Sequence, residues 1–153
     1  MATTLESLFS ALPTLRAFHA HNSPVYPLLD KVAREAVESL FKETGDEAPK
    51  NFSPFGSIFF PYFKMGAITS LDLFGLDELI LFSFYWLNRD KYKKVADIGA
   101  NIGLHSLLMK KCGFQVRLFE PDPIHFQKLQ EILAKNHLPS GEAHCAAVSN
   151  KGG

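Results

Sequence analysis

The chain has 153 residues, of which 46% are hydrophobic, and its 16 basic residues balance 16 acidic ones. This composition is typical of one or two small globular domains with enough apolar material for a core. A net charge of zero disfavours a nucleic-acid binder that works by neutralising phosphates. The longest apolar stretch, residues 79–87, is interrupted only by Ser83 and is far shorter than the roughly 20 residues of a membrane-spanning helix.

The amino terminus and the cysteines indicate the compartment. The first residues lack the basic segment that opens a secretory signal peptide. Cys112 and Cys145 are too few for a disulfide framework and lack the spacing of zinc ligands. We therefore expect a cytoplasmic protein with reduced thiols, no metal ion and no membrane span.

The first forty residues predict two helices. Residues 1–22 are weakly patterned, and Pro13 is expected to break or kink them. A better helix begins at Pro24, because apolar residues recur at helical spacing as far as Phe41. Its polar face carries charges of both signs, which favours a packing helix over one that lies on a membrane surface.

Residues 42–57 combine glycine, proline and polar residues, and this mixture predicts a linker or domain boundary. We therefore expect an N-terminal helical extension over residues 1–57 and a second domain over residues 58–153. Within the second domain, residues 58–93 are expected to form a lead-in hairpin and helix, and residues 94–153 the first three strands of a sheet.

Eight of the fourteen phenylalanines fall between positions 52 and 84. Core packing is the main interpretation, since large rings dominate burial and few basic residues separate them for nucleic-acid binding. A lid over a cofactor cleft is the alternative for some of the rings.

Residues 58–63 predict a strand that Pro61 confines to an edge, followed by a return strand through residue 68. Asp77 is expected to cap a buried helix that runs to about Asn88.

The most informative pattern begins at residue 94. A short apolar strand over residues 94–98 ends in Gly99 and Gly103, and a helix over residues 102–112 follows. A second strand, at 115–119, then ends in the carboxylate of Glu120. This is the layout of a site for a ribose-bearing cofactor at the carboxyl edge of a parallel sheet.

The remaining residues complete an alternating pattern. Asp122 and Pro123 are expected to open a helix that runs to about His137. A third strand is expected from Glu142 to Val148. Alternation of strand and helix predicts a parallel sheet with right-handed crossovers and the strand order 3-2-1.

Two cofactor classes use such a layout. Dinucleotide sites require Gly-x-Gly-x-x-Gly, but Asn101 and Leu104 occupy the second and third glycine positions here. S-adenosylmethionine (SAM) carries no phosphate and tolerates these side chains. SAM is therefore the preferred cofactor, an NAD(P)-binding oxidoreductase domain is the alternative, and a non-catalytic interaction module is the third reading.

Three segments then indicate a family. Residues 97–106 (DIGANIGLHS), 119–123 (FEPDP) and 146–152 (AAVSNKG) resemble the FkbM-type methyltransferases, and residues 76–79 are similar to the lead-in helix common there. The resemblance implies a Rossmann-like class I methyltransferase fold, which is α/β with a doubly wound, mostly parallel sheet. It also implies SAM-dependent, mostly O-directed, methyl transfer. Because it covers only the first half of such a catalytic domain, a fragment that stops after the third strand is the preferred interpretation. A shorter protein that covers the free edge of the sheet with residues 58–68 is the alternative.

The pattern and the resemblance together select a set of residues for the cofactor. Glu120 is expected to accept hydrogen bonds from the ribose hydroxyls. Asp97 is expected either to receive the ammonium group of the methionine end or to fix the loop by accepting backbone N–H bonds. Residues 146–148, at the end of the third strand, are expected to flank the adenine. The complete set of expected SAM-binding residues is Asp97, Gly99, Ala100, Asn101, Gly103, Glu120, Pro121 and Ala147.

No residue is assigned to catalysis. His105 is a conceivable general base one turn into the helix, but nothing pairs it with a second group, and a packing role is preferred. The pattern leaves the methyl acceptor open among small molecules, glycans and lipids.

Overall fold

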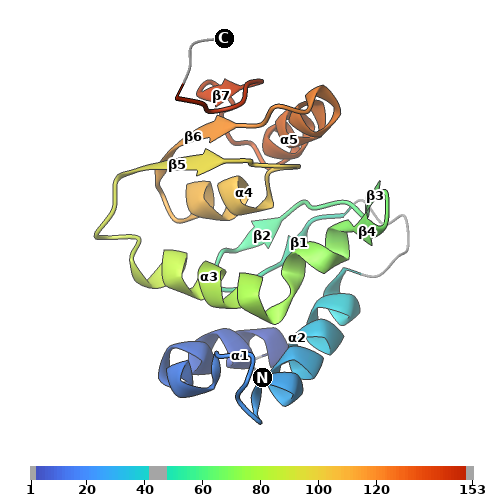
Figure 1. The fold of residues 1–153 in the computed structure, drawn as a ribbon, viewed down its shortest axis with the longest axis vertical. Helices are drawn as coiled ribbons and strands as arrows, with labels where there is room; N and C mark the ends of the chain where they lie inside the picture. Colours follow the sequence, from blue (N-terminus) through green and yellow to red (C-terminus); the bar gives the residue numbers. More distant parts are fainter. Residues whose placement is uncertain (1–2, 42–47, 151–153) are drawn as a thin grey trace. The chain divides into compact units, whose positions relative to one another are not determined.

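The computed structural model describes residues 3–41 and 48–150, which form five α-helices and a three-stranded parallel sheet, together with two short hairpins (Figure 1). The chain divides into two compact units, Met1–Leu87 and Asn88–Gly153. This division differs from the expected one at residue 57, because residues 58–87 group with the N-terminal helices. None of the described helices is long and apolar enough to cross a membrane.

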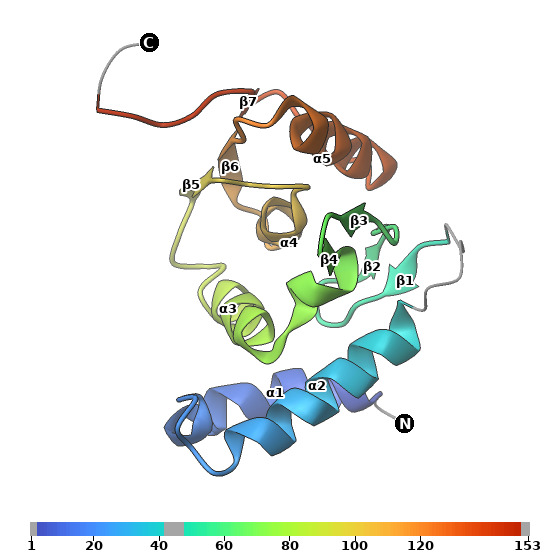
Figure 2. The same ribbon diagram turned by 45° about the vertical axis from the view of Figure 1, so that its right-hand side comes forward.

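The N-terminal unit opens with two helices that pack against each other (Figure 2). Helix α1 spans Thr4–Ala11, and 3-10 turns at Leu12–Thr14 and Arg16–Phe18 follow it. The α-helix therefore ends next to Pro13, as predicted. Helix α2 spans Tyr26–Leu40, which confirms the second predicted helix.

Two short hairpins follow. Strand β1 (Lys50–Asn51) pairs with β2 (Ser57–Ile58), and β3 (Lys64–Met65) pairs with β4 (Ile68–Thr69), both antiparallel. The predicted aromatic strand at 58–63 was wrong in extent, since only its first residue lies in a strand and the return pairing starts later. Part of the predicted linker, residues 42–47, lies outside the described residues.

The rest of the predicted linker belongs to the core of the unit. Phe52 is fully buried, and its ring lies 5.5 Å from those of Phe9 and Phe74 in edge-on contacts. Phe55 is also buried and stacks on Phe52 at 5.8 Å. Large rings buried in this way stabilise a unit strongly. Core packing is therefore confirmed for these rings, and the interpretation of this stretch as a boundary was wrong.

Helix α3 (Leu76–Leu87) confirms the predicted third helix but corrects two details. Asp77 lies inside its first turn, where the carboxylate accepts a hydrogen bond from the Tyr26 hydroxyl at 2.9 Å, so it is not the cap. Leu79 and Phe82 are fully buried, but Leu81 is 45% exposed. Burial is therefore confined to one face, although the sequence is apolar nearly all round.

The C-terminal unit contains the parallel sheet, in the spatial order β5-β6-β7. Its five elements follow the predicted alternation: β5 (Lys94–Ile98), α4 (Leu104–Lys111), β6 (Gln115–Phe119), α5 (Pro123–Lys135) and β7 (Ala143–His144). Both neighbouring strand pairs are parallel, which confirms the predicted order 3-2-1. Asp122 caps α5 as predicted, since its Oδ1 accepts the N–H groups of Ile124 and His125.

Helices α4 and α5 lie on one face of the sheet. The sheet grows in one direction from β5 to β7, so right-handed crossovers place both helices on the same side, and the two helices contact each other. Val116 and Leu118 of β6 are buried on the helix side, whereas Arg117 between them is exposed on the other.

The third strand is much shorter than predicted. Strand β7 comprises only Ala143 and His144, and the expected continuation to Val148 was wrong. The N–H of Ala146 donates to the carbonyl of His144 at 2.9 Å, and this tight turn bends the chain out of the sheet. Residues 145–150 are exposed and form no strand.

Candidate functional site

The loop that follows β5 is tied to the end of β6. The N–H groups of Gly99 and Ala100 both donate to the carbonyl of Phe119, at 2.8 and 3.0 Å. Gly99, Asn101 and Gly103 all have positive φ, at +78°, +51° and +89°. Glycine takes this conformation freely, and asparagine is the side-chain-bearing residue that tolerates it best. In the sequence Gly-Ala-Asn-Ile-Gly, the two glycines and the asparagine therefore occupy the three positions that need positive φ.

Glu120 braces this loop from the neighbouring strand. It is only 6% exposed, yet both carboxylate oxygens have partners. Oε2 accepts the N–H of Asn101 at 2.7 Å, and Oε1 accepts the N–H of Asp122 at 2.8 Å. A carboxylate has about four acceptor positions, and the described residues fill two of them. Glu120 thus joins the loops after β5 and β6, a role that the sequence did not indicate.

Asp97 is held by a side chain that the sequence analysis missed. The hydroxyl of Ser106 in α4 donates to Asp97 Oδ2. Ser106 is fully buried, and Asp97 is half-buried on the strand face that α4 covers. No backbone N–H of the described residues bonds to Asp97, so the expectation that it fixes the loop through backbone N–H bonds was wrong. Asp97 lies in β5 and Ser106 in α4, so their contact depends on how the helix packs on the strand.

The two loop glycines have different surroundings. A Cβ added to Gly99 would meet no heavy atom within 4 Å, so the space over this residue is open. A Cβ on Gly103 would lie 2.8 Å from Leu129 Cγ in α5. Gly103 therefore allows the start of α4 to approach a neighbouring helix, whereas Gly99 leaves room beside the backbone.

The remaining predicted residues are dispersed around this edge of the sheet. Ala100 is buried and Pro121 is exposed beside Glu120. Ala147 is exposed and lies beyond the end of β7, so residues 146–148 do not end a strand as expected. His144 does end that strand, and its ring stacks on Phe119 with the centroids 5.0 Å apart. The sequence analysis had not selected His144.

Other reactive side chains offer weaker sites. Burial raises the pKa of the Cys112 thiol to about 11, which keeps it protonated and unreactive at neutral pH. His105 is half-buried in the first turn of α4. Asp122 has its pKa lowered by the N–H of His125 and then by that of Ile124, as a helix cap should.

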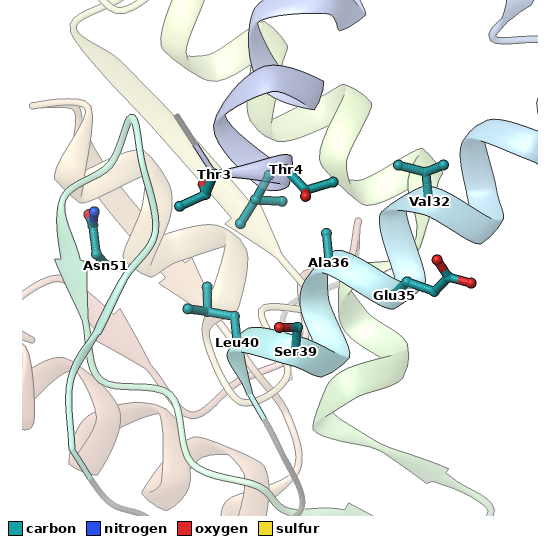
Figure 3. Close-up of a pocket in the computed structure, with 9 residues that line it drawn as sticks. Thr3, Thr4, Val32, Glu35, Ala36, Ser39, Leu40 and Asn51 are labelled. Carbon is teal, nitrogen blue, oxygen red and sulfur yellow. The ribbon is translucent and has the colours of Figure 1, made fainter. Parts of the chain in front are cut away.

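A groove of about 600 Å³ lies in the N-terminal unit, between the start of α1, the second half of α2 and β1 (Figure 3). Among its described lining residues, Glu35 is the one ionisable side chain, and it is exposed, so these residues offer no pair of groups for catalysis. The lining residues are Thr3, Thr4, Leu5, Val32, Glu35, Ala36, Ser39, Leu40 and Asn51. The carboxyl edge of the parallel sheet is therefore the stronger candidate.

Comparison with known proteins identifies no relative of this chain. No protein-family model, curated protein or solved structure matches the chain significantly. The features of this chain that point to a function are therefore the loop after β5 and the carboxylates of Asp97 and Glu120.

Proposed function

We propose that the C-terminal unit binds SAM and forms the cofactor-binding part of a SAM-dependent methyltransferase of the FkbM type. The observation that carries this proposal is Glu120, a buried carboxylate at the carboxyl end of β6 that braces the positive-φ loop after β5. Ligands of open α/β sheets bind at this edge. The proposed complete fold is Rossmann-like and doubly wound, with further helices on the sheet face opposite α4 and α5.

Glu120 is suited to a ribose. Its carboxylate is oriented by two backbone N–H groups, so little side-chain entropy remains to be lost when a ligand binds. Its two remaining acceptor positions match the two hydroxyls of a ribose. The loop after β5, which Glu120 braces, has open space beside Gly99. These features support a ribose-bearing ligand at this edge of the sheet.

The same geometry disfavours a dinucleotide. A pyrophosphate needs free backbone N–H groups at the second glycine of its motif. Here that position is Asn101, whose N–H is already bonded to the carboxylate of Glu120. A pyrophosphate at this point would compete for the N–H and be repelled by the buried negative charge. SAM places no phosphate there.

Bound SAM would supply an activated methyl group for an acceptor, which we propose to be a hydroxyl of a small molecule, a sugar or a lipid. The residues of this chain would contribute binding and orientation. Holding two reactants in the productive geometry can supply roughly 7–11 kcal/mol of a barrier. No side chain described here is assigned as the base.

The direct test is calorimetric titration of the whole chain with SAM and S-adenosylhomocysteine, with NAD in parallel and circular dichroism to verify folding. Saturable binding of the two sulfur ligands but not of NAD is expected. NAD binding without SAM binding would favour the oxidoreductase alternative. A folded chain that binds neither would contradict a cofactor role and leave an interaction module.

The variant that tests the site is Glu120→Gln, compared with Glu142→Gln. Glu142 is a surface acid of the same unit, 3.5 Å from Arg117. Loss of a charged hydrogen bond costs about 1.5–3 kcal/mol, so Glu120→Gln should weaken SAM binding by about 10-fold or more. Glu142→Gln should leave it unchanged. Equal affinities for the two variants would refute the assignment of Glu120.

A further inference from the structure

The exposed face of α3 carries three large apolar side chains in a row. Leu81, Phe84 and Leu87 are 45%, 49% and 46% exposed, and they recur every three residues along the helix. Helix α2 of the same unit instead exposes charged side chains, such as the ion pair of Lys31 and Glu35. Large apolar side chains gathered in one exposed patch are typical of a surface that binds another protein.

Opposite charges lie at the two ends of this row. Asp77 is in the first turn of α3, and its carboxylate is 54% exposed. Lys91 is exposed in the turn that directly follows the helix. The N–H groups of Lys91 and Tyr92 both donate to the carbonyl of Asn88, at 2.9 and 3.2 Å, so the backbone continues in a helix-like turn. The row therefore runs from an acid, through three apolar side chains, to a base.

The order of these residues is symmetric about Phe84. Leu81 and Leu87 lie three residues from it on either side, and Asp77 and Lys91 lie seven residues from it on either side. At about 100° per residue, all four lie within about 60° of Phe84 around the helix. A second copy turned end for end about Phe84 places Leu81 on Leu87 and Asp77 opposite Lys91. A two-fold interface requires this kind of self-complementary surface.

We propose that two copies of this chain associate through α3, with the two helices antiparallel and the two-fold axis at Phe84. The apolar rows bury each other, and the two pairs of Asp77 and Lys91 set the direction, because a parallel pair would oppose like charges. The occupant of this surface is a second copy, since the complementary charges lie on the same face of the same helix. Helix α3 has 12 residues and is about 18 Å long, so the interface is small and the affinity is low.

Sedimentation velocity of the whole chain tests the association. The chain should pass from monomer to dimer as its concentration rises from about 10 to about 500 µM. Phe84→Asp brings two carboxylates together at the axis and should weaken the dimer by about 10-fold or more. Leu28→Asp is the matched control, because Leu28 is an exposed leucine of α2, and it should leave the dimer unchanged.

Circular dichroism verifies that each variant folds, and Phe84→Ala carries the same comparison if Phe84→Asp does not fold. A wild-type chain that stays monomeric at every concentration would overturn the proposal. Equal weakening by Phe84→Asp and Leu28→Asp would also overturn it, because the dimer would then form through another surface.

Reversing one charge tests the ends of the interface. Lys91→Glu opposes two acids at each end and should weaken the dimer by about threefold to tenfold. Lys64→Glu makes the same change at an exposed lysine of β3 and should have no effect. Equal effects of the two variants would mean that net charge, and not the pairing of Asp77 with Lys91, controls association, and would contradict the antiparallel arrangement.

Disulfide trapping tests the position of the axis. Both cysteine variants are made with Cys145→Ser, because Cys145 is exposed whereas Cys112 is buried. In the proposed dimer Phe84→Cys places two thiols at the axis, whereas the thiols of Leu87→Cys lie about 9 Å apart along the helices, beyond the reach of a disulfide. Oxidation should therefore link the Phe84→Cys variant and not the Leu87→Cys variant. Equal yields from both would indicate a parallel pair and overturn the proposed geometry.

Discussion

The buried polar groups of the two units have different roles. In the N-terminal unit, buried Ser70 donates to the carbonyl of Pro61 and accepts the N–H of Phe63, and so it satisfies the backbone of a hairpin. In the C-terminal unit, buried Glu120 is ionisable and lies at the edge of a sheet. Burying a charge is costly unless it is well bonded, and Glu120 meets this condition through the N–H groups of Asn101 and Asp122.

The apolar cores of the two units also differ, since one is mainly aromatic and the other mainly aliphatic. Rings from α1, the first hairpin and α3 meet around Phe52, which is built for packing. The sheet unit is held by aliphatic side chains such as Leu107 and Leu118, and the rings of Phe119 and His144 stack where β6 and β7 end. The comparison indicates one unit stabilised by aromatic packing and another whose polar groups are arranged around a loop.

The largest expected effect tests the aromatic unit. Phe52→Ala removes a fully buried ring and should lower the free energy of unfolding of the N-terminal unit by about 3–5 kcal/mol. Trp86 is the single tryptophan, and its ring lies 5.7 Å from Phe55, so its fluorescence during urea unfolding reports this unit. Leu81→Ala, at a site 45% exposed, should cost much less. Similar losses for the two variants would contradict a core centred on Phe52.

The next effect compares the two loop glycines of the sheet unit. Gly103→Ala combines a φ of +89° with a Cβ 2.8 Å from Leu129 Cγ, and should cost about 2–4 kcal/mol of stability. Gly99→Ala has the strained φ but open space, and should cost about 1–2 kcal/mol. Thermal unfolding gives the order, and the reverse order would contradict the assignment of Gly103 to helix packing.

Titration with SAM compares the same two glycine variants by their affinity for the cofactor. Gly99→Ala places a methyl group in the open space beside the loop and should weaken SAM binding beyond its effect on stability. A folded Gly103→Ala variant should affect binding less, because its methyl group faces α5. If Gly99→Ala leaves the SAM affinity unchanged, the ligand does not occupy that space.

Local patterns of the sheet unit could be predicted from the sequence. The strands at 94–98 and 115–119 and the cap at Asp122 match the structure, because each depends on neighbouring residues alone. A strand is recognised by its apolar run and a cap by its side chain and the following proline. The same local reasoning placed the glycine loop and Glu120 at one edge of the sheet.

The parts that failed depend on contacts distant in sequence. Residues 48–57 resemble a linker by composition, but the burial of Phe52 depends on Phe9 and Phe74, which no local window includes. The bond from Ser106 to Asp97 and the approach of Gly103 to Leu129 likewise require the packed helix positions. Site residues could thus be selected from the sequence, whereas their partners could not.

The smallest expected effect concerns a surface group of the N-terminal unit. Partial burial, and then the hydrogen bond to Asp77, raise the pKa of the Tyr26 hydroxyl from 10.0 to about 12. An unfolded chain therefore loses this proton at lower pH than the folded chain. The stability that Tyr26 contributes is complete below pH 10 and is lost as the pH rises from about 10 to about 12.

Tyr26→Phe isolates that contribution. The variant lacks the hydroxyl, so its stability should fall less steeply than that of the wild type between pH 10 and 12, although lysines titrate in both chains. The absorbance of tyrosinate near 295 nm provides an independent reading, because one tyrosine should ionise late in the folded wild type and be missing from the variant. Identical stability profiles and identical absorbance titrations above pH 10 would mean that the bond to Asp77 does not persist in solution. In that case one side-chain hydrogen bond fewer would stabilise the N-terminal unit, and aromatic packing would carry a larger share of its stability.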